Sequence, residues 1–154
     1  MFFVPIPYEI QTVVKNESTL TGKSVRQIVI EKLRGETVDK TFPPELTQNL
    51  SKLEEIKNLK RNWNGNNSKP VSKKLVNKTK SLIINLTRQP QIFPTANNSI
   101  QLEYDGENNS YLEFQVSKDK SLAFYKVDKI GKETSGKIIA TSFALESLIE
   151  EFYE

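Results

Sequence analysis

The sequence predicts an α+β fold, in which a small helical module is followed by a helical hairpin, a three- or four-stranded antiparallel sheet and a C-terminal helix. Two observations lead to this prediction. Apolar residues recur at helical spacing as far as Leu86 and alternate with polar residues from Ile100 onward. The adjacent prolines Pro43 and Pro44 cannot extend a preceding helix, so they mark a boundary. We therefore expect a module at 1–40, a linker at 41–45 and a domain at 46–154.

The N-terminal module begins with an apolar segment, residues 1–6, and continues with two short helices. Pro7 suits a first helical position because its missing N–H needs no partner there. Gly22 supplies a stop, since glycine tolerates left-handed backbone angles. Ser24 and Gln27 have the spacing of a capping box, which predicts that the second helix begins at Ser24. The apolar stripes of the two helices are Ile10, Val13, Val14 and Leu20, and then Val25, Ile28, Val29 and Leu33.

This order of apolar strand, helix, glycine turn and capped helix resembles the ribbon-helix-helix module of Arc- and MetJ-type repressors, over roughly the first quarter of the chain. The resemblance implies a homodimer whose paired strands enter the DNA major groove. It also implies that the start of the second helix binds a backbone phosphate through Lys23, Ser24 and Arg26. A plain helical hairpin with a hydrophobic N-terminal tail is the alternative.

The predicted strand lacks the chemistry of a base reader. Met1 and Phe3 face outward on the family's pattern and cannot donate a hydrogen bond to a base. Val4 and Ile6 point inward with a period of two. These four residues are therefore also predicted to form a protein interface, either with a second copy of the chain or with another partner.

Residues 46–154 predict two helices, then strands, then a helix. Apolar residues run at helical spacing from Leu46 to Trp63, and a second helix is expected from about Ser72 to Leu86. Strands are expected at 100–104, 112–116 and 122–127, with a fourth, less regular one at 137–140. The apolar positions of the final helix are Ala144, Leu145, Leu148, Ile149 and Phe152.

Part of this domain resembles a small domain found in uncharacterised proteins of bacteria, phages and plasmids. The resemblance spans residues 46–127. It rests on Trp63-Asn64-Gly65, Pro70, Pro90, Pro94-Thr95 and Glu103-Tyr104, and it implies no particular activity. Asn97-Asn98 stands where that family usually has Asp-Gly.

Charge is strongly segregated along the chain. Residues 56–102 hold nine basic residues and no acidic one, whereas residues 103–154 hold eleven acidic and six basic residues. A basic region of this kind favours a polyanion or an acidic protein surface, although lysines on outer helix faces also serve solubility. The predicted nucleic-acid contacts in this stretch are Lys60, Arg61, Lys73, Lys74 and Lys78.

Composition argues against catalysis and against metal binding. The chain has no cysteine and no histidine, which removes thiolate nucleophiles, histidine bases and the usual zinc ligands. It also lacks a phosphate-binding glycine loop. We expect no enzymatic activity, no cofactor and no metal. No apolar run reaches membrane-spanning length, so a cytoplasmic location is expected.

Two functions fit these observations. The first is a dimeric DNA-binding regulator or antitoxin-like autorepressor. The second is an inhibitor from a phage or mobile element, of the anti-CRISPR or anti-defence kind, that occludes a host nucleoprotein. The acidic C-terminal helix favours the second function, because a row of carboxylates can occupy a nucleic-acid channel.

Overall fold

The computed structural model describes residues 18, 22, 24, 25, 27–29 and 42–154. The chain divides into two compact units, Met1–Thr41 and Phe42–Glu154. The predicted N-terminal strand, with Met1, Phe3, Val4 and Ile6, lies outside the described residues, as do Lys23 and Arg26.

Two local predictions for the first unit are confirmed. Gly22 has a φ of 68°, and its N–H donates to the Ser18 carbonyl at 3.0 Å. Ser24 and Gln27 form the capping box. The Ser24 N–H donates to Gln27 Oε1 at 3.0 Å, and the Gln27 N–H donates to Ser24 Oγ at 3.2 Å. In the helix that follows, Ile28 is buried, whereas Val25 is 42% exposed.

The second unit begins with a helical hairpin. Helix α3 spans Pro44–Lys57, with proline in its first turn, where a missing N–H costs nothing. Helix α4 spans Lys73–Ile83, and its N-cap Ser72 accepts the Leu75 N–H. The predicted inward face of α4 is confirmed, because each member is buried: Leu75, Val76, Thr79, Leu82, Ile83 and, just past the helix, Leu86.

The prediction that the first helix continues to Trp63 is wrong. Helix α3 ends at Lys57. The Asn58 side chain donates to the Glu54 carbonyl at 3.0 Å, which gives a partner to one of the carbonyl groups left unpaired at the C-terminal end of the helix. Asn62 then takes a left-handed φ of 63°, which a helix does not accommodate. Trp63 therefore belongs to the loop between α3 and α4.

Five strands form an antiparallel meander in the order β1-β2-β3-β4-β5. Their bounds are Gln91–Pro94 for β1, Ile100–Asp105 for β2, Tyr111–Val116 for β3, Ser121–Val127 for β4 and Glu133–Ile139 for β5. A short 3-10 turn, Glu107–Asn109, joins β2 to β3. Helix α5, Ser142–Tyr153, ends the chain and begins at the N-cap Thr141, whose side chain accepts the Ala144 N–H.

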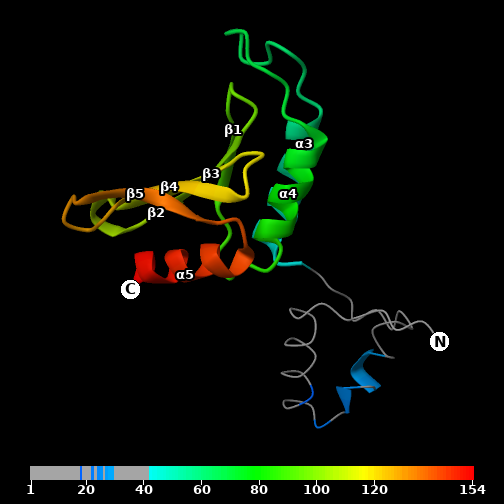
Figure 1. Cartoon of the computed structure of the whole chain (residues 1–154), viewed down its shortest axis with the longest axis vertical. Helices are drawn as coiled ribbons and strands as arrows, with labels where there is room; N and C mark the ends of the chain where they lie inside the picture. The colour runs from blue at the N-terminus through cyan, green and yellow to red at the C-terminus, as the bar shows by residue number, and fades with distance from the viewer. Residues whose placement is uncertain (1–17, 19–21, 23, 26, 30–41) are drawn as a thin grey trace. The chain divides into compact units, whose positions relative to one another are not determined.

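One face of the sheet forms the core with the three helices. Leu102, Leu112, Phe114 and Leu122 point to this face and are fully buried against residues from α3, α4 and α5. Figure 1 shows α5 running along the sheet and α3 beside α4. The α+β class is therefore confirmed for residues 42–154.

The prediction of three or four strands is wrong, because the sheet has five. Strand β1 was missed because Pro90 precedes its four residues, Pro94 closes them and only Ile92 is buried. Strand β5 begins four residues before the predicted Lys137, and almost all of it is exposed, so it has no alternating pattern to detect.

Candidate nucleic-acid interface

Four of the five predicted contacts in this domain lie at one end of the α3–α4 hairpin. Lys60 and Arg61 follow α3, and Lys73 and Lys74 form the first turn of α4. All four are exposed, as is Lys69 in the loop between them, which our sequence interpretation did not select. No carboxylate in residues 42–154 forms a salt bridge with any of these five side chains. We call Lys60, Arg61, Lys69, Lys73 and Lys74 the basic end.

The loop that holds the basic end is fixed by its own hydrogen bonds. Asn62 Oδ1 accepts the Asn67 N–H at 2.8 Å, and the Asn62 N–H donates to the carbonyl of the buried Ser68 at 2.8 Å. The Trp63 indole N–H donates to the Lys69 carbonyl at 3.2 Å. Gly65, with a φ of 77°, permits the tightest part of the turn. The loop that carries Lys60, Arg61 and Lys69 is therefore held in one conformation by hydrogen bonds.

The turn between β1 and β2 anchors this loop to the sheet. The Lys69 N–H donates to the Ala96 carbonyl at 3.0 Å, and the Ser72 N–H donates to Asn98 Oδ1 at 2.9 Å. The turn is itself closed by the Thr95 N–H, which donates to the Ser99 carbonyl at 2.9 Å. The Trp-Asn-Gly and Pro-Thr segments of the sequence motif are thereby brought together.

The first turn of α4 concentrates positive charge. The N-terminus of a helix carries about half a unit of positive charge from its unpaired N–H groups. Acidic residues are stabilising there, but α4 has Lys73 and Lys74 and no acidic residue in its first turn. These charges repel one another, so a bound anion would relieve an unfavourable arrangement.

Lys78 differs from the other predicted contacts. Its ammonium group donates to the Ser117 carbonyl at 2.9 Å and also to the Asp119 carbonyl, which ties α4 to the turn between β3 and β4. Two of its three N–H donors are therefore used in hydrogen bonds within the domain. Lys78 thus stabilises the fold and is less available than the other lysines to bind a phosphate.

Two further lysines of the basic stretch share one carboxylate. Glu54 on α3 pairs with Lys57 at 2.8 Å and with Lys80 on α4. Hydrogen bonds from these two ammonium groups lower the pKa of Glu54 from 4.5 to about 2. These ion pairs join the two helices and partly neutralise Lys57 and Lys80, whereas the five cations of the basic end have no salt bridge within residues 42–154.

In the first unit, the groups of Ser24 are already used. Its N–H and its hydroxyl both bond to Gln27, the hydroxyl donating to Gln27 Oε1 at 3.1 Å. A phosphate at this helix start would therefore have to be met by other N–H groups or by cationic side chains.

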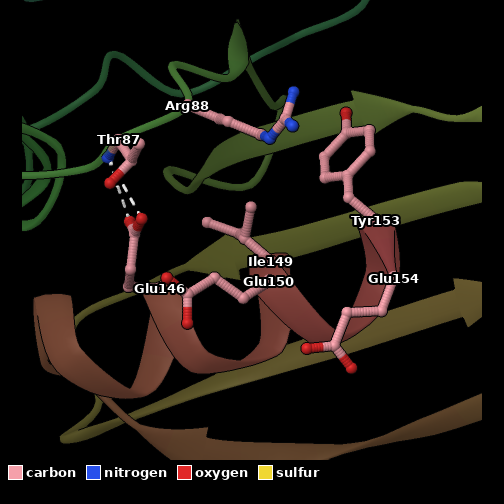
Figure 2. A pocket seen from close by; sticks show the side chains of 7 residues that line it. All are labelled: Thr87, Arg88, Glu146, Ile149, Glu150, Tyr153 and Glu154. Atoms are coloured by element: carbon pink, nitrogen blue, oxygen red, sulfur yellow. Dashed lines mark hydrogen bonds between the residues drawn. The ribbon is translucent and has the colours of Figure 1, made fainter.

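A groove on the opposite, acidic part of the domain lies between α5 and the segment that follows α4 (Figure 2). It has a volume of about 340 Å³. The Thr87 N–H donates to both oxygens of Glu146, at 3.1 and 3.2 Å, and the Arg88 guanidinium lies 4.4 Å from the centre of the Tyr153 ring. Glu150 and Glu154 line the same groove.

The groove offers charge but no nucleophile. Arg88 is held by stacking on Tyr153, and the Tyr153 hydroxyl donates to the Asp105 carbonyl at 2.9 Å. Burial raises the pKa of Tyr153, so the hydroxyl stays protonated near neutral pH. The side chains present can bind a charged group but include no activated hydroxyl.

Within the described residues, no group of three or more acidic, histidine or cysteine side chains could hold a metal ion. The helices described in the structure also include none long and apolar enough to cross a membrane.

These residues define an α+β domain, a five-stranded antiparallel meander with helices on one face and a basic helical end. Comparisons with protein-family models, with curated proteins and with solved structures found no match to this chain.

Proposed function

We propose that the protein is a non-enzymatic DNA-binding regulator, of the antitoxin-like autorepressor kind, that acts in the cytoplasm as a dimer. The observation that carries this proposal is the basic end. It holds five exposed cations on an ordered loop and helix start, and none of them pairs with a carboxylate of residues 42–154. Phosphate oxygens are the partners that such a surface suits, because counterion release then drives binding.

The N-terminal module would supply the dimer and a second set of phosphate contacts. The capping box at Ser24 and the glycine turn at Gly22 fit the ribbon-helix-helix resemblance. The partly exposed Val25 leaves an apolar side chain that a second module could cover. The mass of the intact chain in solution tests this part, since a monomer at micromolar concentration contradicts it.

The experiment for DNA binding compares two variants of equal charge. In the first, Lys60, Arg61, Lys73 and Lys74 are changed to Gln, which removes four of the five positive charges of the basic end. In the second, the exposed turn lysines Lys118, Lys120, Lys129 and Lys132 are changed to Gln. We expect a mobility shift with duplex DNA to be lost in the first variant and kept in the second. Equal losses would assign the binding to net charge alone.

One observation favours the alternative, an inhibitor that occludes a host nucleoprotein. Helix α5 exposes Glu150, the residue after it is the exposed Glu154, and Phe143 at its start is 83% exposed. Exposed carboxylates and an exposed aromatic ring on the same helix suit a basic protein channel. Substituting Phe143 with Ser and Glu150 with Lys would abolish capture of such a partner and leave DNA binding unchanged.

A further inference from the structure

Strand β5 is one of the two edge strands of the sheet. In residues 42–154, β5 pairs only with β4, and all its residues except Ile138 are exposed. The β4–β5 register pairs Val127 with Glu133 and Ser121 with Ile139. An edge of this kind presents unpaired backbone groups that can accept another strand.

The hydrogen bonds at the two ends of β5 show which groups are free. The Asp128 N–H donates to the Lys132 carbonyl, and the Ala140 N–H donates to the Lys120 carbonyl. Hydrogen-bonded pairs alternate along an antiparallel ladder, so even-numbered residues of β5 bond to β4. Odd-numbered residues therefore turn their backbone groups to the open edge. These are Glu133, the first residue of the strand, then Ser135, Lys137 and Ile139, the last.

The charges on this edge are arranged symmetrically. Glu133 and Lys137 lie two residues before and two residues after Ser135, and all three side chains share the face of the sheet that the helices leave open. If two copies of β5 pair antiparallel about Ser135, Glu133 of each copy lies opposite Lys137 of the other. Opposite charges in such positions attract, and like charges repel.

Other registers lose this match. A shift that pairs Glu133 with Glu133, or Lys137 with Lys137, sets like charges opposite each other. The remaining shifts that align the free backbone groups leave both charges opposite neutral residues. The same two side chains therefore favour this register over its immediate neighbours and disfavour the next registers on either side.

We propose that β5 pairs antiparallel with β5 of a second copy of this chain, centred on Ser135, to join two sheets into one. This interface is separate from the dimer expected of the N-terminal module. Together the two interfaces would link chains into tetramers or longer arrays, as suits a regulator that binds several adjacent DNA sites.

A single cysteine tests the proposal directly, because the chain contains none. At the centre of the proposed ladder two facing Cα atoms would be about 5.5 Å apart, which lies within the range that a disulfide spans. We expect Ser135→Cys in the full chain to form a disulfide-linked pair on mild oxidation. Ser147→Cys, an exposed position on α5, is the control. Its rate should be at least tenfold lower.

Charge reversal then tests the register. In the Ser135→Cys chain, Glu133→Lys or Lys137→Glu alone should slow cross-linking at least tenfold, since each sets like charges opposite each other. An equal mixture of these two variants, or the double reversal in one chain, should restore the rate, which also shows that the variants fold. Equal rates at positions 135 and 147 would overturn the proposal. So would single reversals that leave the rate unchanged. A dimer made by the N-terminal module would raise both rates together and would not produce the charge dependence.

Discussion

The Lys78 ammonium group donates a hydrogen bond to the Ser117 carbonyl at 2.9 Å, although 39 positions separate the two residues. This contact divides the basic stretch into two kinds of lysine. Lys78 holds α4 against the sheet, whereas Lys73 and Lys74, about one turn earlier, make no such contact within residues 42–154 and are exposed there. Stability and nucleic-acid binding should therefore respond to different lysines.

Lys78→Gln should destabilise the domain by about 1–2 kcal/mol, because two carbonyls lose a charged donor. Lys74→Gln removes the same charge from an exposed position and should change stability by less than about 0.5 kcal/mol. Urea unfolding followed by circular dichroism measures both. Equal effects of the two substitutions would contradict the structural role of Lys78.

Two buried serines should respond differently to loss of the hydroxyl. Ser99 and Ser110 are each 3% exposed. Ser99 Oγ lies 2.5 Å from Thr95 Oγ1 and accepts from Gln115 Nε2 at 3.0 Å, whereas Ser110 Oγ has no hydrogen-bond partner among the described residues. We expect Ser99→Ala to cost about 1–2 kcal/mol, and Ser110→Ala to be neutral or stabilising, since a buried hydroxyl without a partner costs free energy. Thermal or urea unfolding distinguishes the two, and an equal cost for both would count against this view.

The Glu54 ion pairs should make stability depend on pH in the acid range. The pKa of Glu54 falls from 4.5 to about 2 in the folded chain because Lys57 and Lys80 bond to its carboxylate. A carboxyl whose pKa is lowered by folding stabilises the folded chain at pH values above its pKa in the unfolded chain. That contribution disappears as pH falls from 4.5 to 2. Glu54→Gln should therefore lower the urea midpoint at pH 7 but not at pH 2.

Glu55→Gln is the control for this prediction, since Glu55 is exposed and forms no salt bridge with the described residues. Its urea midpoint should follow that of the original chain at both pH values. A Glu54→Gln effect that persists unchanged at pH 2 would show that packing, and not the ion pairs, is what the substitution disturbs.

The sequence predicted those elements whose side chains divide cleanly between core and solvent. The helical spacing in α4 and the alternation of Leu112, Phe114 and Val116 in β3 reflect burial on one face, so both elements were found. Strand β5 was predicted too short, because a nearly exposed edge strand has no such division. Trp63 was assigned to a helix because its spacing fitted, although the chain had already turned at Asn62.

The candidate site was harder to predict than the fold. That the basic residues lie close in the sequence was enough to select Lys60, Arg61, Lys73 and Lys74. What separates them from Lys78 is a contact with a turn far along the chain, and no local pattern encodes it. Lys69 lies between the selected residues in the sequence but was not selected, and the bond from its N–H to the Ala96 carbonyl, which fixes its loop, is also a contact that no local pattern encodes.

The salt dependence of DNA binding is the most direct test of the central claim that the basic end meets phosphates. Each phosphate contact contributes about 0.9 to the slope of log K against log salt concentration for duplex DNA. We predict that changing Lys60, Arg61, Lys73 and Lys74 to Gln reduces that slope by roughly two to four units, whereas the variant with the four turn lysines changed keeps the original slope. An unchanged slope in the first variant, with its fold intact by circular dichroism, would contradict the account.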